Sequence, residues 1–397
     1  MTIKRQAQHS ESAAPFLRIS QCFITVLAAL ACLAALPRIS DAATSWYALG
    51  TSHTVVLTEE GTVWTLGEND FGQLGQGVVD AHNHEPQQVP GLNRVKAVAA
   101  AGNHSAALRR DGTVWVWGDN ISGQLGNDDM MLSATPLPVK GLRGVIAIAA
   151  GGSHILALKR DGTVWAWGNN NYGQLGTASF ISTPDPVRVK GLDGVTSIAA
   201  GAYHCLALKQ DGSVWSWGYN AYGELGNPAV SSKGSAVPVQ VAGIRSATSV
   251  SAGVNHSVAM QGNNTVWVWG SNYYSQIGNG TTGYGSRTPV QVRIGEQVAD
   301  ITARAHHTIA LLKDGTALAW GDRGTQRWGN GLEMAGSAVP VRMEGYTGPI
   351  AIAALVNPVT IGQTSMMAWL NEQRSEQTAV ADASDYATYT VAFAQPE

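Results

Sequence analysis

Six histidines recur at nearly constant intervals, and histidine is the residue type in this chain best suited to chemistry. They lie 50 to 52 residues apart, and neutral imidazole is a common metal ligand and proton carrier. The interval is that of an internal repeat, so equivalent positions lie one repeat unit apart in space. That is too far for one ion with bonds of about 2.0 Å. We therefore predict structural histidines that hydrogen-bond neighbouring backbone, and no metal site. They are His53, His104, His154, His204, His256 and His307.

Carboxylates suited to a catalytic pair occur only singly. Glu68, Asp119 and Glu224 fall at loop positions of different repeats, so a glycosidase pair would have to converge from separate units. The sequence contains no G-x-S-x-G motif, no P-loop and no zinc-spaced Cys/His set. Cys205 lies in the apolar run AYHCLAL and is predicted to be a buried small hydrophobe. We predict no enzyme and no cofactor. A hydrolase or lyase built from scattered loop residues remains an alternative.

The histidines belong to a repeat with several other landmarks. Each histidine is followed by a segment such as RDGTVWVWG or QDGSVWSWG, then by one such as NNYGQLG, and a proline closes the unit. Six copies are clear. A seventh, IAALVNPVTIGQTSMMAWL, keeps a tryptophan at Trp369 but has no histidine. Seven copies of about 51 residues occupy the chain after its first forty or so positions and leave no room for a second domain.

Each repeat reads as a set of short strands. In TVWVWG, Trp115 and Trp117 share one face and the valines the other, which is strand alternation with both faces apolar. Asp-Gly pairs such as Asp111-Gly112 predict type I′ hairpins. Several short strands every 50 residues form a blade, and blades packed around an axis protect one another's edges. The sequence predicts an all-β fold, a seven-bladed β-propeller over residues 43–370.

Composition excludes several classes of protein. Charged residues are only 13%, with 46 Gly and 13 Trp, which argues against disorder and against a coiled coil. The net charge of −3 gives no basic footprint for nucleic acid.

The first 42 residues read as a secretory signal peptide. Lys4, Arg5 and Arg18 precede an apolar run from Cys22 to Leu36, and small residues follow at a cleavage position near Ala42. The run is shorter than the roughly 20 residues of a membrane span. We expect an exported protein, periplasmic or secreted, that does not span the membrane after cleavage. An uncleaved signal anchor remains open.

The G-x-x-H, D-G-T-V-W-x-W-G and N-x-x-G-Q-L-G series resembles the repeats of the regulator of chromosome condensation family. The resemblance implies a seven-bladed propeller whose first and last strands share a blade. We therefore expect residues 371–397 to contain a polar linker and a closing strand at 387–393. Guanine-nucleotide exchange in the family depends on an insertion in one blade. The even spacing here leaves no such insertion, so exchange is not expected.

Two rings of positions vary between copies, and loops on a fixed frame are where function changes. One ring is the turn before each histidine, and the other precedes the Gly-Gln-Leu-Gly turn and is rich in Tyr, a residue typical of binding hot spots. The sixth copy departs from the pattern with an Arg-Trp pair. The candidate binding residues are Phe71, Asn103, Tyr172, Tyr203, Tyr222, Asn255, Tyr274, Arg327 and Trp328.

These observations predict a monomeric, non-enzymatic propeller that binds an unidentified protein partner through loops on one face. Binding of a glycan or of cell-wall polysaccharide through the tyrosines is the alternative. The structural alternative is that the tyrosine rings simply pack over the next blade.

Overall fold

The structure, a computed structural model, describes residues 46–58, 60–80, 82–128, 131–322 and 336–347. These residues form six four-stranded antiparallel sheets and contain no helix. No segment among them is therefore a helix long and apolar enough to cross a bilayer. The strands are β1 (Trp46–Leu49), β2 (His53–Leu57), β3 (Val63–Glu68), β4 (His82–Gln88), β5 (Val95–Ala101), β6 (His104–Arg109), β7 (Val114–Asp119), β8 (Leu132–Pro138), β9 (Val145–Ala150), β10 (His154–Lys159), β11 (Val164–Gly168), β12 (Thr183–Arg188), β13 (Val195–Ala200), β14 (His204–Lys209), β15 (Val214–Gly218), β16 (Ser235–Gln240), β17 (Ala247–Ala252), β18 (His256–Gln261), β19 (Val266–Asn272), β20 (Gly283–Val292), β21 (Val298–Arg304), β22 (His307–Leu312), β23 (Thr316–Gly321) and β24 (Ser337–Thr347).

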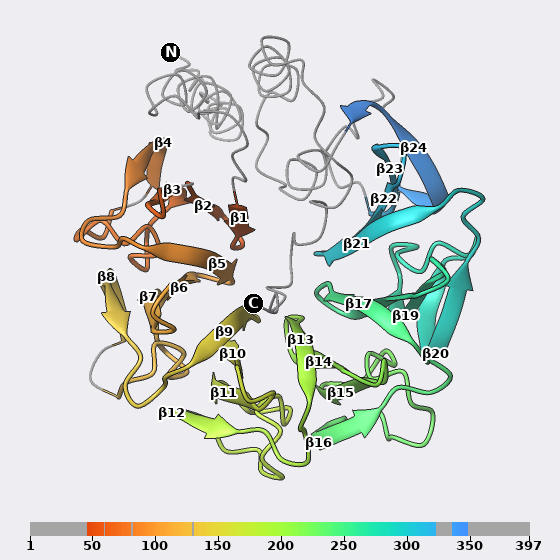
Figure 1. The fold of residues 1–397 in the computed structure, drawn as a ribbon, viewed down its shortest axis with the longest axis horizontal. Coiled ribbons are helices and arrows are strands. Elements are labelled where there is room, and N and C mark those ends of the chain that lie inside the picture. Colours follow the sequence, from red (N-terminus) through yellow and green to blue (C-terminus); the bar gives the residue numbers. More distant parts are fainter. Residues whose placement is uncertain (1–45, 59, 81, 129–130, 323–335, 348–397) are drawn as a thin grey trace, which may run out of the picture.

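The sheets are the blades of a propeller, which confirms the predicted fold class. Each blade is four consecutive strands, from blade 1 (β1–β4) to blade 6 (β21–β24). The first strand of every blade lies nearest the axis, and the blades follow one another around it (Figure 1). At the inner edge, the Arg304 guanidinium at the end of β21 donates to the carbonyl oxygens of Leu49 and Gly50, which joins blade 6 to blade 1.

Two predictions about the last blade fall beyond the described residues. The seventh repeat, around Trp369, and the closing strand at 387–393 both lie there, so they stay predictions. The blade that begins at Trp46 already has four strands, all of them from residues 46–88.

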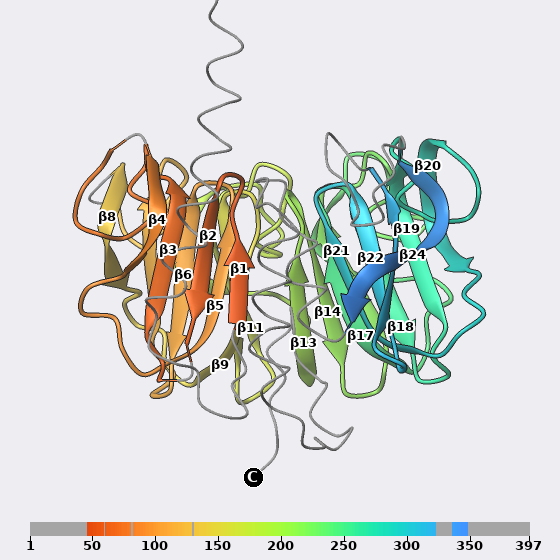
Figure 2. The ribbon, with the colours of Figure 1, turned by 90° about the horizontal axis from the view of Figure 1, so that it is seen from above.

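The strands run between two ends of the molecule (Figure 2). We call one the histidine end. It carries the turns before β2, β6, β10, β14, β18 and β22 and the loops after β3, β7, β11, β15, β19 and β23. We call the other the hairpin end. It carries the turns between the second and third strand of each blade and the links from one blade to the next.

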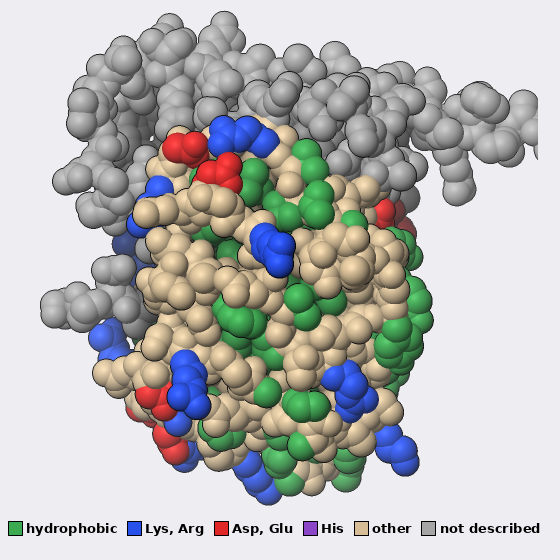
Figure 3. Space-filling view, turned by 90° about the vertical axis from the view of Figure 1, so that its right-hand side faces the viewer, with side chains coloured by type: hydrophobic (Ala, Val, Ile, Leu, Met, Phe, Trp, Pro, Cys, Tyr) green, Lys and Arg blue, Asp and Glu red, His purple; other side chains and the backbone are tan. Residues whose placement is uncertain are grey.

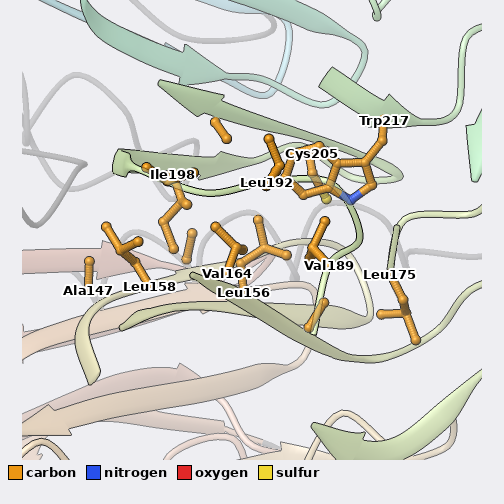
Figure 4. Close-up of a cluster of buried hydrophobic side chains, with 14 residues drawn as sticks. Ala147, Leu156, Leu158, Val164, Leu175, Val189, Leu192, Ile198, Cys205 and Trp217 are labelled. Atoms are coloured by element: carbon orange, nitrogen blue, oxygen red, sulfur yellow. The ribbon is translucent and has the colours of Figure 1, made fainter. Parts of the chain in front are cut away.

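Each core lies between neighbouring blades. Between blades 3 and 4, Leu156 and Val164 pack against Ile198 and Trp217, all of them nearly or fully buried (Figure 4). Burying one such side chain contributes about 1.5–3 kcal/mol. In blades 2 to 6 the tryptophan at the position of Trp217 is a core residue, as predicted from the alternation, whereas blade 1 has Leu66 there.

The type I′ prediction for the Asp-Gly turns is wrong. At the β6–β7 turn, Gly112 has a φ of 78° but Asp111 is not in the left-handed region. The Gly112 N–H donates to the Arg109 carbonyl and the Arg109 N–H to the Thr113 carbonyl, the pattern of a type I turn with a glycine bulge. Asp111 Oδ1 accepts from the Thr113 N–H and hydroxyl, so the carboxylate caps its own turn.

Candidate binding site

The recurring histidines link one blade to the next. The Nε2 atom of His53 lies 2.8 Å from Ser105 Oγ, the residue after the next histidine along the chain. His204 makes the same contact with Ser257 Oγ at 2.9 Å. Equivalent pairs are His154 with Cys205 Sγ at 3.1 Å and His256 with Thr308 Oγ1 at 3.1 Å. The prediction of structural histidines is consistent with these contacts, but the predicted partner was wrong. It is a side chain of the following blade and not neighbouring backbone.

The hydroxyl in each pair fixes the proton on the imidazole. Ser105 Oγ donates to the Gln73 carbonyl, and Ser257 Oγ donates to the Glu224 carbonyl. Since each hydroxyl has one hydrogen, the imidazole Nε2–H must be the donor to the hydroxyl. In the neutral imidazole the proton is therefore on Nε2. Burial lowers the pKa of His53 to about 3 and that of His204 to about 4, in agreement with this state.

The same carbonyls also receive a tryptophan. Trp117 Nε1 donates to the Gln73 carbonyl at 2.8 Å, and Trp269 Nε1 donates to that of Glu224 at 2.8 Å. The second residue of the Gly-Gln-Leu-Gly type turn is thus held by two groups of the next blade, except in blade 2, where Trp167 alone donates to the Gln124 carbonyl. The loop before that turn is consequently fixed to a rigid frame.

His104 and Cys205 are exceptions to the pattern. Ile155 stands where the other blades have a hydroxyl or thiol, and neither nitrogen of His104 has a hydrogen-bond partner. Cys205 is buried, as predicted, and takes the place of the hydroxyl by donating to the Gln174 carbonyl at 3.4 Å. Burial raises the pKa of its thiol, which disfavours the reactive thiolate.

Ser257→Ala should lower the free energy of unfolding by about 1–3 kcal/mol. It leaves the His204 Nε2–H buried without an acceptor and removes a donor to the Glu224 carbonyl. Urea unfolding monitored by tryptophan fluorescence measures the change. Ser257→Thr keeps a hydroxyl, as Thr308 does in blade 6, and should lose less. Ser232→Ala, in an exposed loop, is the control. Equal stability of Ser257→Ala and this control would show that the inter-blade bond contributes nothing.

A connected chain of tyrosines lies over blades 3 to 5 at the histidine end. Tyr172, Tyr203 and Tyr219 are in mutual contact, with ring centroids 4.8 to 6.2 Å apart. Tyr219 contacts Tyr222 at 6.3 Å, and Tyr222 continues to two further rings at 5.6 and 5.3 Å. Most contacts are edge-to-face, an arrangement favourable for aromatic pairs. We define the tyrosine chain as Tyr172, Tyr203, Tyr219, Tyr222, Tyr273 and Tyr284.

The tyrosine chain is both packed and exposed. Tyr172 reaches blade 4 and Tyr222 reaches blade 5, so the rings do pack over the next blade. Even so, Tyr203, Tyr273 and Tyr284 expose 42%, 51% and 57% of their surface. Figure 3 views the molecule from the side of blades 5 and 6 and colours Tyr with the hydrophobic side chains. Hydrophobic side chains gather along the right-hand edge of this view. Rings that are ordered by one another and open to solvent form a preorganised contact surface.

The structure brings together some of the predicted binding residues. Tyr172, Tyr203 and Tyr222 meet in the tyrosine chain. Tyr274 instead stacks on His306 at 4.5 Å, toward blade 6. Phe71 and Asn103 lie at the same end on blades 1 and 2, away from the chain. Arg327 and Trp328 lie outside the described residues.

Three residues of the tyrosine chain were missed. Tyr219 follows the strand directly, at the position of Asp119 and Asn169 in earlier repeats. Tyr273 is adjacent to a predicted residue, and Tyr284 belongs to the long β20, where its hydroxyl donates to the Ala221 carbonyl at 2.8 Å. The high frequency of Tyr between residues 203 and 284 was the sequence signal that could have indicated these three residues.

Glu224 lies beneath this surface and stands where blades 1 to 3 and 5 have the glutamine of the Gly-Gln-Leu-Gly type turn. In blades 2 and 3 a glutamine amide donates to Asp119 or Asn169, and its oxygen accepts from the N–H two residues earlier. In blade 4 the Glu224 carboxylate keeps the second contact, from the Tyr222 N–H at 2.9 Å. Since Tyr219 stands where Asp119 and Asn169 do, the other carboxylate oxygen accepts instead from Asn255 Nδ2 at 3.2 Å. Burial raises the pKa of Glu224, and burial and the nearby Glu224 carboxylate raise that of Tyr219. Asn255, a predicted binding residue, therefore ties blade 5 to the loop of blade 4.

The possible metal ligands in the part of the chain that the structure describes are its His, Cys, Asp and Glu side chains. Within it, no three His, Cys, Asp or Glu residues gather closely enough to hold an ion. The two single carboxylates Asp119 and Glu224 each serve their own loop through the bonds described above. The groups gathered at this end are aromatic rings, amides and a buried carboxyl.

A protein-family comparison matches residues 30–368 to the RCC1-like domain. Among curated proteins, the human X-linked retinitis pigmentosa GTPase regulator is 42% identical over 81 residues, 20% of this chain and 8% of its own. The Xenopus laevis regulator of chromosome condensation is 34% identical over 87 residues, 21% of this chain and 20% of its own. The aligned segments thus span a small part of these relatives' length.

Solved structures share the fold over most of the chain. Prp20p of Saccharomyces cerevisiae, reported with its binding properties to Gsp1p and histones, matches with a TM-score of 0.68 and 28% identity. The match covers 78% of this chain and 78% of that one. Human WBSCR16 matches with a TM-score of 0.67 and 23% identity, covering 77% and 82%, which shows the fold alone.

Proposed function

This chain belongs to the family of RCC1-like domains, and on that premise we propose that it is an exported, non-catalytic module that binds a protein partner on the tyrosine chain. The supporting observation is the tyrosine chain itself, with six rings in contact over three blades and several of them about half exposed. Tyr side chains supply large contact area at low entropic cost, and they are enriched among binding hot spots.

The rigidity of the frame supports a binding role. The turn below Tyr222 is held by Trp269 and Ser257 of blade 5, and the turn below Tyr172 by Trp217 and Cys205 of blade 4. A surface that is ordered before the partner arrives loses less conformational entropy on binding. Yeast Prp20 was solved in complex with Kap60, so a relative of this fold engages a protein partner.

Catalysis and nucleotide exchange are not part of the proposal. Asp119, Glu224 and four of the recurring histidines are engaged in the structural bonds set out above. The histidine spacing of 50 to 52 residues leaves no inserted wedge between His53 and His307.

The partner is tested by affinity capture with the chain from residue 43 onward as bait, against secreted and envelope fractions. The proposal predicts that the bait retains one protein in stoichiometric amount. The amount retained should fall at least about tenfold when Tyr172→Ala, Tyr203→Ala and Tyr273→Ala are combined. A variant with Phe180→Ala and Ile181→Ala removes exposed hydrophobic side chains outside the tyrosine chain and should bind normally. Circular dichroism confirms that both variants are folded. Equal loss from both variants, or no loss from either, would overturn the assignment to the tyrosine chain.

A polysaccharide is the second candidate, favoured by the exposed rings of Tyr203, Tyr273 and Tyr284, which are flat amphipathic surfaces. Affinity electrophoresis in gels with cell-wall polysaccharides separates the two. Retardation that disappears with the same triple variant, together with no captured protein, would move the glycan to first place.

Export rests on residues 1–42 and is proposed on their sequence pattern. N-terminal sequencing of the protein from culture medium and periplasm should give a start near residue 43. A cytosolic protein that retains residue 1 would contradict it.

A further inference from the structure

The hairpin end of blades 2 and 3 is strongly cationic. Four neighbouring segments, 89–96, 109–113, 139–144 and 159–163, form it, and against their cations they carry only Asp111 and Asp161. The cations are Arg94, Lys96, Arg109, Arg110, Lys140, Arg143, Lys159 and Arg160.

These cations approach one another across two blades. Burial, then Arg160 and then Arg110 lower the pKa of Lys96, which places three like charges from two blades close together. The ion pairs of the described chain lie elsewhere, at Arg188 and Arg342. Like charges that are brought together and left unpaired cost stability and are a feature of anion-binding surfaces.

The two acids of this end are already engaged. Asp161 Oδ1 accepts from the Thr163 N–H at 3.0 Å and from its hydroxyl at 2.6 Å, and Asp111 does the same with Thr113. Each holds its own turn, and each also interacts electrostatically with neighbouring cations, Asp111 with Arg109 and Arg94 and Asp161 with Lys159. The eight cations therefore face only two carboxylates on these segments. Arg109 and Lys159 lie over the rings of Trp115 and Trp165 at 4.0 and 5.3 Å, which orders their charged ends.

The surface is shallow. A hollow of about 440 Å³ is lined by Arg143, Gly144, Lys159, Arg160 and Asp161. The exposed large hydrophobic side chains of the described residues lie in loops of the opposite end or on the outer strands β16, β20 and β24. Among these residues the hairpin end of blades 2 and 3 therefore offers charge without an exposed large hydrophobic side chain to insert.

We propose that the hairpin end of blades 2 and 3 docks on an anionic membrane surface through the phosphate groups of its lipids. Binding is peripheral and electrostatic, because each Lys or Arg near such a surface contributes without any insertion. The tyrosine chain, at the opposite end, then faces away from the membrane. The docking does not depend on the proposed protein partner.

A lipid surface fits the geometry better than a nucleic acid does. The cations are spread over the broad end of two blades and do not follow a groove. Binding of single strands uses aromatic stacking platforms, and exposed aromatic side chains of the described residues are at the other end. Reading of a duplex needs a helix or β-ribbon inserted in a groove, whereas this end presents tight turns.

Sedimentation with sucrose-loaded vesicles tests the proposal on the full chain. Vesicles of phosphatidylcholine with about 30% phosphatidylglycerol should retain the protein at about 50 mM salt, and retention should fall at least about tenfold at about 300 mM. Pure phosphatidylcholine vesicles should not retain it. Arg160→Gln should lower the partition coefficient about fivefold, the equivalent of about 1 kcal/mol, whereas Lys233→Gln, which removes the same charge from an exposed loop of the histidine end, should not. Lys96→Gln, Arg110→Gln and Arg160→Gln combined should abolish measurable binding.

Several results would overturn the proposal. One is equal retention by both kinds of vesicle, and another is equal effects of Arg160→Gln and Lys233→Gln. Full displacement by inorganic phosphate at constant ionic strength would assign the hollow to a free anion. Binding to a short DNA duplex without binding to vesicles would assign it to a nucleic acid. Thermal unfolding of the combined variant at the wild-type temperature shows that its loss of binding is not a loss of fold.

Discussion

Acidification from pH 6.5 to about pH 5 should unfold this propeller or lower its stability by roughly 10 kcal/mol. Burial holds the pKa of His53 and His154 at about 3 and that of His104 at about 4, and it also lowers the pKa of the other recurring histidines. The unfolded chain has histidines with a pKa near 6.5. Protonation of each histidine in the unfolded chain therefore lowers the free energy of unfolding by about 1.5–2 kcal/mol between pH 6.5 and pH 5.

The sign of the effect follows from the depressed pKa values. Below pH 6.5 the histidines of the unfolded state bind protons, whereas those of the folded state do not. Their contribution to the free energy of unfolding is therefore fully present above that pH and is lost as the pH falls. Two buried carboxyls act in the opposite sense. Burial raises the pKa of Asp300 to about 6 and also raises that of Glu224, so their contribution grows as the pH falls from 6 to 4. They are two groups against six histidines, so the loss dominates.

Urea unfolding at pH 8, 7, 6 and 5 measures this dependence. The transition midpoint should be nearly constant from pH 8 to 7 and then fall steeply. Histidine proton resonances of the folded protein should not titrate between pH 7 and 5. Resonances of the six histidines that titrate near pH 6.5 in a folded protein would refute the neutral, buried state.

Gly151→Ala should destabilise the protein by about 3 kcal/mol or more. A Cβ at this position would lie 2.0 Å from His154 Cε1 and 2.6 Å from its Nδ1. Gly151 does not have a left-handed φ, so the expected loss of stability is steric. It comes from the buried imidazole of His154, which packs directly on the glycine. Gly50, Gly201 and Gly253 stand at the same position and show the same close approach to the histidine ring, whereas blades 2 and 6 have Ala101 and Arg304 there.

Two further variants separate this steric effect from a general intolerance of alanine. Gly295→Ala meets no atom within 4 Å and should change stability by less than about 0.5 kcal/mol. His154→Ala removes the ring, so adding Gly151→Ala to it should cost much less than in the wild type. Additive losses in the double variant would show that the glycine is needed for another reason.

Much of the frame could be predicted because the repeat fixes it. The period of the histidines placed one of them at the start of a strand in every blade, from His53 on β2 to His307 on β22. The alternation around Trp117 identified a strand with a buried face. Cys205 was correctly predicted to be buried from the apolar run around it.

Contacts between repeats could not be read from the sequence. The acceptor for His53 is Ser105, which is 52 residues away, and its identity depends on how one blade lies on the next. Tyr219 and Tyr284 were missed for the same reason, since they approach Tyr172 and Tyr222 only when three blades are assembled. The type I′ expectation failed locally, because Asp111 prefers to cap its turn rather than take a positive φ.

Site-specific photo-crosslinking tests the central claim, that the protein partner binds at the histidine end on the tyrosine chain. A photoreactive residue is placed at Tyr273, which is 51% exposed, or at Asp161 on the hairpin end. Each protein is irradiated with the captured partner. The account predicts a crosslinked product from position 273 and none from position 161. A product from position 161 alone, or equal products from both, would contradict it.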